Sequence, residues 1–188
     1  MGSEMCIRDR TMMYFVVDTI VNFGLLDNPA LREQGPVRAI CPVPGYDRHF
    51  TLSEGFGIEM VTVPMTDDGP DMDAVEALVS DDPSCRFLWC VPKYANPTGC
   101  IYSDATVERI AKLPRLRSES FHVLWDNAYA VHDFRFPRAP LANIFQLAES
   151  AGTADSIIGF ASTSKITFAG AGVGFLTASP AVLDALQA

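Results

Sequence analysis

The chain has 188 residues, of which 48% are hydrophobic and 20% are charged, a composition typical of a soluble globular protein. Its 14 basic and 23 acidic residues give a formal net charge of -9 at pH 7. This charge argues against a nucleic-acid partner and against adsorption to an anionic membrane. No apolar run has the length of a membrane span, and the N-terminus lacks the pattern of a signal peptide, so we expect no membrane partner.

The cysteine and histidine positions exclude two further classes of protein. The five cysteines are odd in number and contain no C-x-x-C pair, which argues against a disulfide framework and against a zinc cluster. A reducing, cytoplasmic location fits this pattern. His122, His132 and Asp133 have no spacing that suits a metal on one helix or hairpin, so we expect no metal site.

Residues 1–10, MGSEMCIRDR, resemble translated sequencing-adapter read-through rather than the start of a fold. We therefore treat them as a non-native segment and exclude them from the fold. The expectation is that 11–188 form a single unit, which is part of a larger domain that begins further upstream.

Helical and extended patterns alternate along the rest of the chain. Helical periodicity is found in 11–26, at the end of 67–82, and in 103–113, 141–150 and 180–188. Short apolar runs typical of strands are 37–41, 58–65, 85–92, 121–129, 156–163 and 172–179. This alternation predicts a three-layer α/β/α fold with a mainly parallel sheet covered on both faces.

Polar side chains cluster where three of the predicted strands end. In open α/β sheets, ligands bind beyond the carboxyl ends of the strands. The segment YANPTG (94–99) follows the third strand, DNAY (126–129) closes the fourth, and STSK (162–165) closes the fifth. Lys165 is notable because no charged residues flank it, so we expect its amine to be buried beside a partner or to work uncharged.

These three segments, in this order and together with DDGPDMDAVEAL (67–78), resemble the active-site signature of fold type I pyridoxal-phosphate enzymes, the aspartate aminotransferase superfamily. The stretches CPVPGYDRHF and STSKITFAGAGVGF are similar to a MocR-related aminotransferase subgroup that includes bacterial aspartate aminotransferases. The resemblance runs from about Met12 to the end of the chain. It implies that the chain is a fragment of the pyridoxal-phosphate-binding large domain.

The resemblance implies a role for each matching residue. Lys165 would hold pyridoxal 5'-phosphate as the internal aldimine and move the substrate proton, and Asp126 would keep the ring nitrogen protonated. These roles agree with general chemistry, since a Schiff-base amine must be deprotonated part of the time and a pyridinium needs a facing carboxylate. Asn96 and Tyr129 would donate to the phenolate oxygen of the cofactor. An ordinary turn residue before Pro97 and an ordinary buried tyrosine are the alternatives for these two positions.

The sequence matches the family less completely at the positions that would bind the cofactor phosphate and stack on the cofactor ring. Ser162 and Ser164 resemble phosphate ligands, although a plain Ser/Thr turn also explains Ser164. The family usually has an arginine about eight residues after the lysine, and ITFAGAGVG contains none. Tyr46 is the candidate for the aromatic that stacks on the ring, whereas a strict alignment puts Val43 there.

The resemblance implies transamination between an amino acid, with aspartate as a candidate, and a 2-oxo acid, by a homodimer. It also implies that a fragment lacking the small domain and the phosphate loop is inactive by itself. Two alternatives stay open. One is an aminotransferase-like effector-sensing domain of a MocR-type transcription regulator. The other is a different pyridoxal-phosphate reaction on the same fold, such as decarboxylation or a lyase reaction, because fold and cofactor do not fix the reaction type.

Overall fold

A seven-stranded sheet in the order β3-β2-β1-β4-β5-β6-β7 forms the middle layer of the computed structural model. The structure describes residues 9–117, 120–133, 136–166 and 172–187. The strands are β1 (Arg38–Val43), β2 (Glu59–Thr66), β3 (Gly69–Pro70), β4 (Cys85–Cys90), β5 (His122–Asp126), β6 (Ile157–Ser162) and β7 (Gly174–Thr177). The five strands from β2 to β6 in this order pair in parallel, and the two edge strands are antiparallel.

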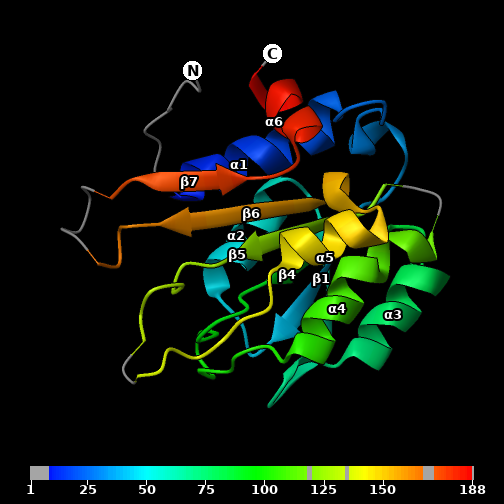
Figure 1. Ribbon diagram of the computed structural model, residues 1–188. Helices are drawn as coiled ribbons and strands as arrows, with labels where there is room; N and C mark the ends of the chain where they lie inside the picture. Colours follow the sequence, from blue (N-terminus) through cyan, green and yellow to red (C-terminus); the bar gives the residue numbers. More distant parts are fainter. Residues whose placement is uncertain (1–8, 118–119, 134–135, 167–171, 188) are drawn as a thin grey trace.

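In the part of the chain that the structure describes, six α-helices cover the two faces of the sheet (Figure 1). They are α1 (Asp9–Asp18), α2 (Asp47–Gly55), α3 (Met72–Asp81), α4 (Asp104–Lys112), α5 (Ile144–Ala151) and α6 (Pro180–Gln187). Buried residues of α3, α4 and α5 share one apolar cluster, and those of α1 and α6 share a second cluster, which α2 joins with partly buried side chains. The predicted three-layer α/β/α fold is confirmed.

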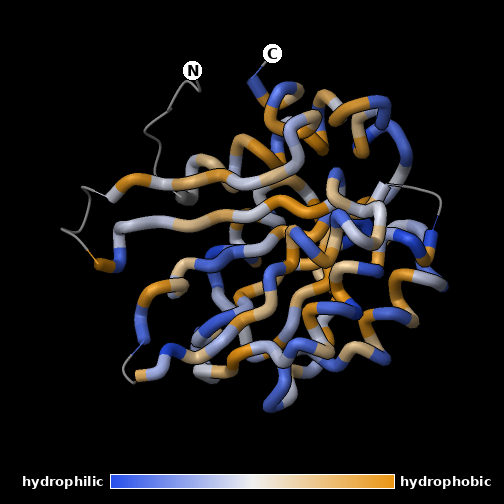
Figure 2. The backbone as a smooth tube through the Cα atoms, viewed as in Figure 1, coloured by the Kyte–Doolittle hydropathy of each residue, from blue (hydrophilic) through white to orange (hydrophobic). Residues whose placement is uncertain are grey.

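Alternation along the strands builds these two clusters. On β4, Leu88 and Cys90 belong to the cluster under α3 to α5, whereas Phe87 and Trp89 belong to the cluster under α1 and α6. Successive side chains of a strand point to opposite faces, so a strand buried on both faces is apolar throughout. Hydrophobic colour accordingly dominates the central strands, while hydrophobic and hydrophilic colours alternate along α3 and α4 (Figure 2).

Two helix starts follow from their capping residues. The Ser103 hydroxyl accepts a hydrogen bond from the Thr106 amide at the start of α4, as the sequence predicts. An Asp71 carboxylate oxygen accepts from the amides of Asp73 and Ala74 at the start of α3. Both helices therefore begin where an oxygen satisfies amides that have no partner within the helix.

The helix predicted for 11–26 differs from the observed one at both ends. It begins at Asp9, continues as a π-helical segment over Thr19–Phe23, and ends at Gly24, whose φ is +88°. A Cβ at Gly24 would lie 2.4 Å from the Asn28 carbonyl oxygen, so the turn requires glycine. The last two residues of the predicted range, Leu25 and Leu26, are therefore not helical.

Helix α2 and strand β3 were not predicted. Helix α2 begins after Tyr46, whose side chain makes no capping hydrogen bond, so the usual marker of a helix start is absent. The Pro44-Gly45 pair in front of it indicates a turn and nothing more. Strand β3 has only two residues, which is too short for any periodicity to be read. Short 3-10 turns are also found among the described residues, over Leu31–Glu33, Leu113–Leu116 and Ala154–Ser156.

Candidate active site

The candidate site lies at the carboxyl ends of β1, β4, β5 and β6. From β1 the chain leads to β2 on one side, and it later returns to β4 on the other side. Such a reversal leaves a crevice between the loops that follow the two adjacent strands. The loops after β1, β4, β5 and β6 are therefore the ones that meet at this edge, and the site residues expected from the sequence lie in these loops or at the last residue of β5 or β6.

One pocket of about 380 Å³, part of it open to solvent, is formed by these loops together with α1. Its lining residues are Met13, Tyr46, Val91, Asn96, Asp126, Ala128, Tyr129 and Lys165. Five of them were singled out from the sequence, and they come from four separate segments of the chain. The structure thus brings Tyr46, Asn96, Asp126, Tyr129 and Lys165 around one space.

Asp126 is the last residue of β5, and its carboxylate is buried with 6% of the side chain exposed. His49 Nε2 lies 2.9 Å from Asp126 Oδ2, and the His49 side chain is itself only 3% exposed. The imidazole stacks on the Trp89 ring, with centroids 4.2 Å apart and planes at 8°. The buried carboxylate therefore has a hydrogen-bonded partner whose own orientation is fixed by packing.

His49 is the functional-site residue that the sequence reasoning missed. It lies on α2, the helix that was not predicted, and it follows Tyr46 by three residues, one helical turn. The Tyr46 and His49 rings meet edge to face with centroids 5.3 Å apart. The sequence feature that could have indicated His49 is its spacing, one helical turn after Tyr46, the aromatic residue at the end of the first predicted strand and turn.

Lys165 lies in the loop after β6, with Nζ 5.4 Å from the centroid of the Tyr129 ring. The side chain of Tyr129 is half-buried, and Lys165 is exposed. The burial expected for Lys165 is therefore wrong for this chain, because its amine lies at the open side of the pocket over an aromatic face. A cation over a tyrosine face is stabilised by the ring quadrupole.

Asn96 is both a turn residue and a pocket residue. The turn is closed by hydrogen bonds from the Gly99 amide to the Ala95 carbonyl and from the Ala95 amide to the Cys100 carbonyl. Asn96 is exposed within this turn and lines the pocket. The two interpretations that the sequence left open are therefore compatible.

Ser162 and Ser164 are joined to each other beside Lys165. The Ser162 hydroxyl donates to the Ser164 hydroxyl at 2.7 Å and accepts from the Ser164 amide at 3.0 Å. A Cβ at Gly172 would overlap Ser164, so glycine permits the close approach of the returning chain. Neither serine is among the residues that line the pocket, and neither is Val43, the alternative to Tyr46.

In the ranges 9–117, 120–133, 136–166 and 172–187, no group of three or more His, Cys, Asp or Glu side chains could hold a metal ion. None of the helices described in those ranges combines the length and apolar character needed to cross a membrane. Residues 167–171 of the arginine-free run lie outside the described residues.

Comparison with known proteins agrees with this geometry. Residues 8–187 match the family model described as aspartate amino-transferase. An aspartate aminotransferase of Corynebacterium glutamicum is 45% identical over 170 residues, which are 89% of this chain and 39% of that protein. The chain thus spans about two fifths of the length of the curated relatives that it matches.

Solved structures agree as well. A crystal structure of an aspartate transaminase from Corynebacterium glutamicum superposes with a TM-score of 0.88 at 41% identity, over 95% of this chain and 42% of that one. The alpha-aminoadipate aminotransferase of Thermus thermophilus, solved as a complex with N-(5'-phosphopyridoxyl)-L-leucine, gives a TM-score of 0.74 at 26% identity over 95% of this chain and 41% of that chain. The fold is that of the fold type I aminotransferases. The chain belongs to the aspartate aminotransferase family.

Proposed function

We propose that this chain is part of the large domain of a pyridoxal-phosphate-dependent aminotransferase, with 11–188 as the segment that belongs to the domain. The observation that carries the proposal is the convergence of five side chains from four segments on one pocket. The match to two fifths of each relative supports the assignment to one domain of a longer protein. An amino acid and a 2-oxo acid are the proposed substrates.

The donor set fits the cofactor group by group. Lys165 supplies an amine that can bond to an aldehyde, and Asp126 supplies a buried carboxylate that suits a protonated ring nitrogen. Asn96 and Tyr129 supply an amide and a phenol for an anionic ring oxygen, and Tyr46 supplies an aromatic face. Ser162 and Ser164 would bind the phosphate through their hydroxyls, although they stand outside the pocket lining.

The bound cofactor would supply an electron sink for the charge that develops when the substrate loses its α-proton. Lys165 Nζ would act as general base and take that proton from the substrate α-carbon. It would then act as general acid and give the proton to a carbon of the cofactor. Lys165 is exposed and lines the pocket, so its amine is not packed away from the space where a substrate would lie. His49 would hold Asp126 in place, so that the carboxylate keeps the ring nitrogen charged.

Aspartate is the amino donor that we propose, on the strength of the aspartate aminotransferase of Corynebacterium glutamicum at 45% identity. A panel of amino acids with one 2-oxo acid acceptor, scored by product formation, tests this choice. Faster turnover of another donor than of aspartate would overturn the substrate and leave the cofactor site standing.

We also propose a cytoplasmic homodimer that binds no nucleic acid. The free cysteines of the described residues, Cys41, Cys85, Cys90 and Cys100, suit a reducing compartment. Light scattering of the full-length gene product tests the dimer. The net charge of -9 supports the absence of nucleic acid from the partners.

Borohydride trapping tests the cofactor site. The full-length gene product is incubated with pyridoxal phosphate, reduced, digested and mapped by mass spectrometry, beside a Lys165→Met control. We expect the pyridoxyl label on Lys165 and its loss in the control. No label on the full-length wild type would overturn the proposal. A label without amino-group transfer would instead favour the effector-sensing domain or another reaction on the same fold.

A further inference from the structure

Asp133, in the loop after β5, binds two neighbouring residues of the loop after β4. Lys93 Nζ lies 3.0 Å from both Asp133 carboxylate oxygens, and the Tyr94 hydroxyl donates to Oδ1 at 2.9 Å. The Ala139 amide donates to the same oxygen at 3.1 Å. The Lys93 and Asp133 side chains are only 7% and 4% exposed, so little of the ion pair faces solvent.

None of these three residues lines the pocket, but each lies close along the chain to one that does. Tyr94 precedes Asn96 by two residues, and Asp133 follows Tyr129 by four. Lys93 Nζ also donates to the Ala130 carbonyl at 3.3 Å, directly after Tyr129. The Asp133 cluster, defined as Lys93, Tyr94 and Asp133, therefore ties together the two loops that carry Asn96 and Tyr129.

The sheet does not hold these loops together. The pairing of β4 with β5 ends at Cys90 and Trp125, before either loop begins. Beyond that point, the ion pair and hydrogen bonds of the Asp133 cluster link the two loops. They fix the spacing of the loops in the way that ladder hydrogen bonds fix strands.

The cluster is costly to build, which argues for a role beyond general stability. Two charges must leave water to form a buried pair, and their attraction offsets this cost only when the geometry and the extra hydrogen bonds are good. Tyr94 also has a φ of +53°, a left-handed conformation that is unfavourable for residues other than glycine. Strained residues of this kind cluster around functional sites. Lys93 lowers the pKa of Asp133, so the carboxylate stays charged at neutral pH.

We propose that Asp133 is a positioning residue that sets the separation of Asn96 and Tyr129 through its bonds to Lys93 and Tyr94. This inference rests on the proposed function, in which Asn96 and Tyr129 donate to the ring oxygen of pyridoxal phosphate. The carboxylate itself is not among the residues that line the pocket, so it acts through its neighbours. It holds the two donors at the spacing that one oxygen atom between them requires.

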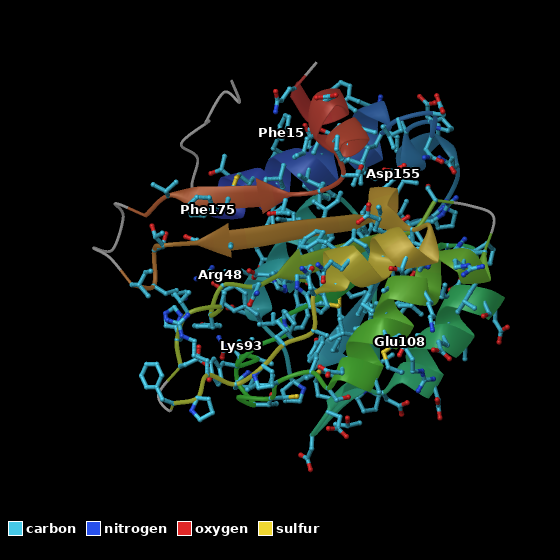
Figure 3. The ribbon with its side chains drawn as sticks, viewed as in Figure 1. Phe15, Arg48, Lys93, Glu108, Asp155 and Phe175 are labelled. Atoms are coloured by element: carbon cyan, nitrogen blue, oxygen red, sulfur yellow. The ribbon has the colours of Figure 1, made fainter. Side chains whose placement is uncertain are left out.

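Two substitutions remove the cluster to different degrees. Asp133→Asn removes the charge, and Tyr94→Phe removes one hydroxyl and keeps the ion pair. Glu108→Gln is the matched control, because Glu108 also pairs with a lysine, Lys112 at 2.6 Å, but does so on the surface of α4. Figure 3 shows Lys93 among the loops at the site end of the sheet and Glu108 on α4, away from them.

Three readouts are measured on the full-length gene product: the affinity for pyridoxal phosphate, the pH midpoint of the visible band of the bound cofactor, and the thermal unfolding of the protein without cofactor. Donors on the ring oxygen stabilise its negative charge, which otherwise favours the protonated form of the bound cofactor, so the visible band changes at lower pH when the donors are in place. Misplaced donors therefore raise the midpoint. We expect Asp133→Asn to weaken pyridoxal-phosphate binding about tenfold, the value of one hydrogen bond to a charged group. Tyr94→Phe should have a smaller effect in the same direction.

If the role of Asp133 were purely structural, the substitutions would lower the temperature of thermal unfolding and leave the pH midpoint of the visible band unchanged. That result would overturn the proposal. Wild-type affinity and midpoint in Tyr94→Phe would also overturn it, and this variant decides alone if Asp133→Asn does not fold. A raised midpoint in Tyr94→Phe with Glu108→Gln unchanged supports it. Absence of trapped label on wild-type Lys165 refutes the proposed function instead, before the variants are compared.

Discussion

His49 Nε2 and Asp126 Oδ2 lie 2.9 Å apart in a region where both side chains are buried, and the imidazole lies flat against Trp89. A carboxylate in such a place has few ways to satisfy its oxygens, so the imidazole is an integral part of the site rather than a neighbour. The same contact links α2 with the end of β5, two segments that are 77 residues apart along the chain.

The first prediction concerns this contact. His49→Phe keeps an aromatic ring against Trp89 but removes the hydrogen bond, which leaves the Asp126 carboxylate oxygen without its partner. We expect a loss of about 1–3 kcal/mol in the free energy of unfolding, measured by urea denaturation. His132→Phe is the control, because neither ring nitrogen of His132 has a partner among the described residues. Equal losses in the two variants would contradict the role of the bond.

The second prediction concerns Asp126 in the reaction. Asp126→Asn retains the shape of the side chain and removes its charge, so a ring nitrogen facing it would no longer be held in its protonated form. We expect turnover to fall by about 100-fold or more, while the trapped label on Lys165 remains. Steady-state kinetics and borohydride trapping on the same samples check both halves. Turnover within a fewfold of wild type would remove Asp126 from the mechanism.

The third prediction concerns the turn that carries Tyr46. A Cβ on Gly45 would lie 2.4 Å from the Pro42 carbonyl oxygen, so Gly45→Ala must displace the backbone. We expect a destabilisation of about 1–3 kcal/mol together with weaker pyridoxal-phosphate binding. The control is Gly55→Ala at the end of α2, where a Cβ meets nothing within 4 Å. That variant should be neutral or more stable by up to about 1 kcal/mol. Urea denaturation and cofactor titration of both variants decide.

The fourth prediction concerns pH. His122 is buried on β5, neither of its ring nitrogens has a partner among the described residues, and burial followed by the charge of Arg86 lowers its pKa to about 4. The unfolded imidazole takes up a proton below its ordinary pKa of about 6.5, whereas the folded one stays neutral down to about 4. The contribution of the neutral His122 to the free energy of unfolding is therefore fully present above pH 6.5, and it decreases as the pH falls from 6.5 to 4.

His122→Leu removes this dependence. Between pH 7 and pH 5 we expect the wild type to lose about 2 kcal/mol more than the variant in the free energy of unfolding. Urea denaturation at several pH values measures both proteins, and carboxylates that they share cancel in the difference. Parallel pH profiles would show that His122 is protonated in the folded state as readily as in the unfolded one.

The fold class and most of the pocket could be predicted because both follow from local signals. Strands that are apolar on both faces alternate with helices, and polar residues at the strand ends mark where loops converge, as with Asp126 at the end of β5. The antiparallel pairing of β6 with β7 could not be predicted from local signals, because the direction of a strand depends on the path of the loop that connects it to its neighbour.

The parts that were missed depend on long-range contacts. His49 meets Asp126 across 77 residues and Lys93 meets Asp133 across 40, and no periodicity links such positions in a single sequence. The exposure of Lys165 was missed for the opposite reason. The sequence around it is uncharged and suggests burial, but the side chain lies on the face of Tyr129 at the open side of the pocket.

The strand order also constrains when the pocket can form as the chain folds. Lys165 follows β6, which pairs in parallel only with β5, and β5 pairs in turn with β4 and β4 with β1. Parallel pairings need long connections and are slow to close. The lysine therefore reaches Tyr46 only after four strands have docked in register. A chain emerging from the ribosome would hold an incomplete pocket, unable to place its amine against a cofactor, until the residues beyond β6 are free to fold.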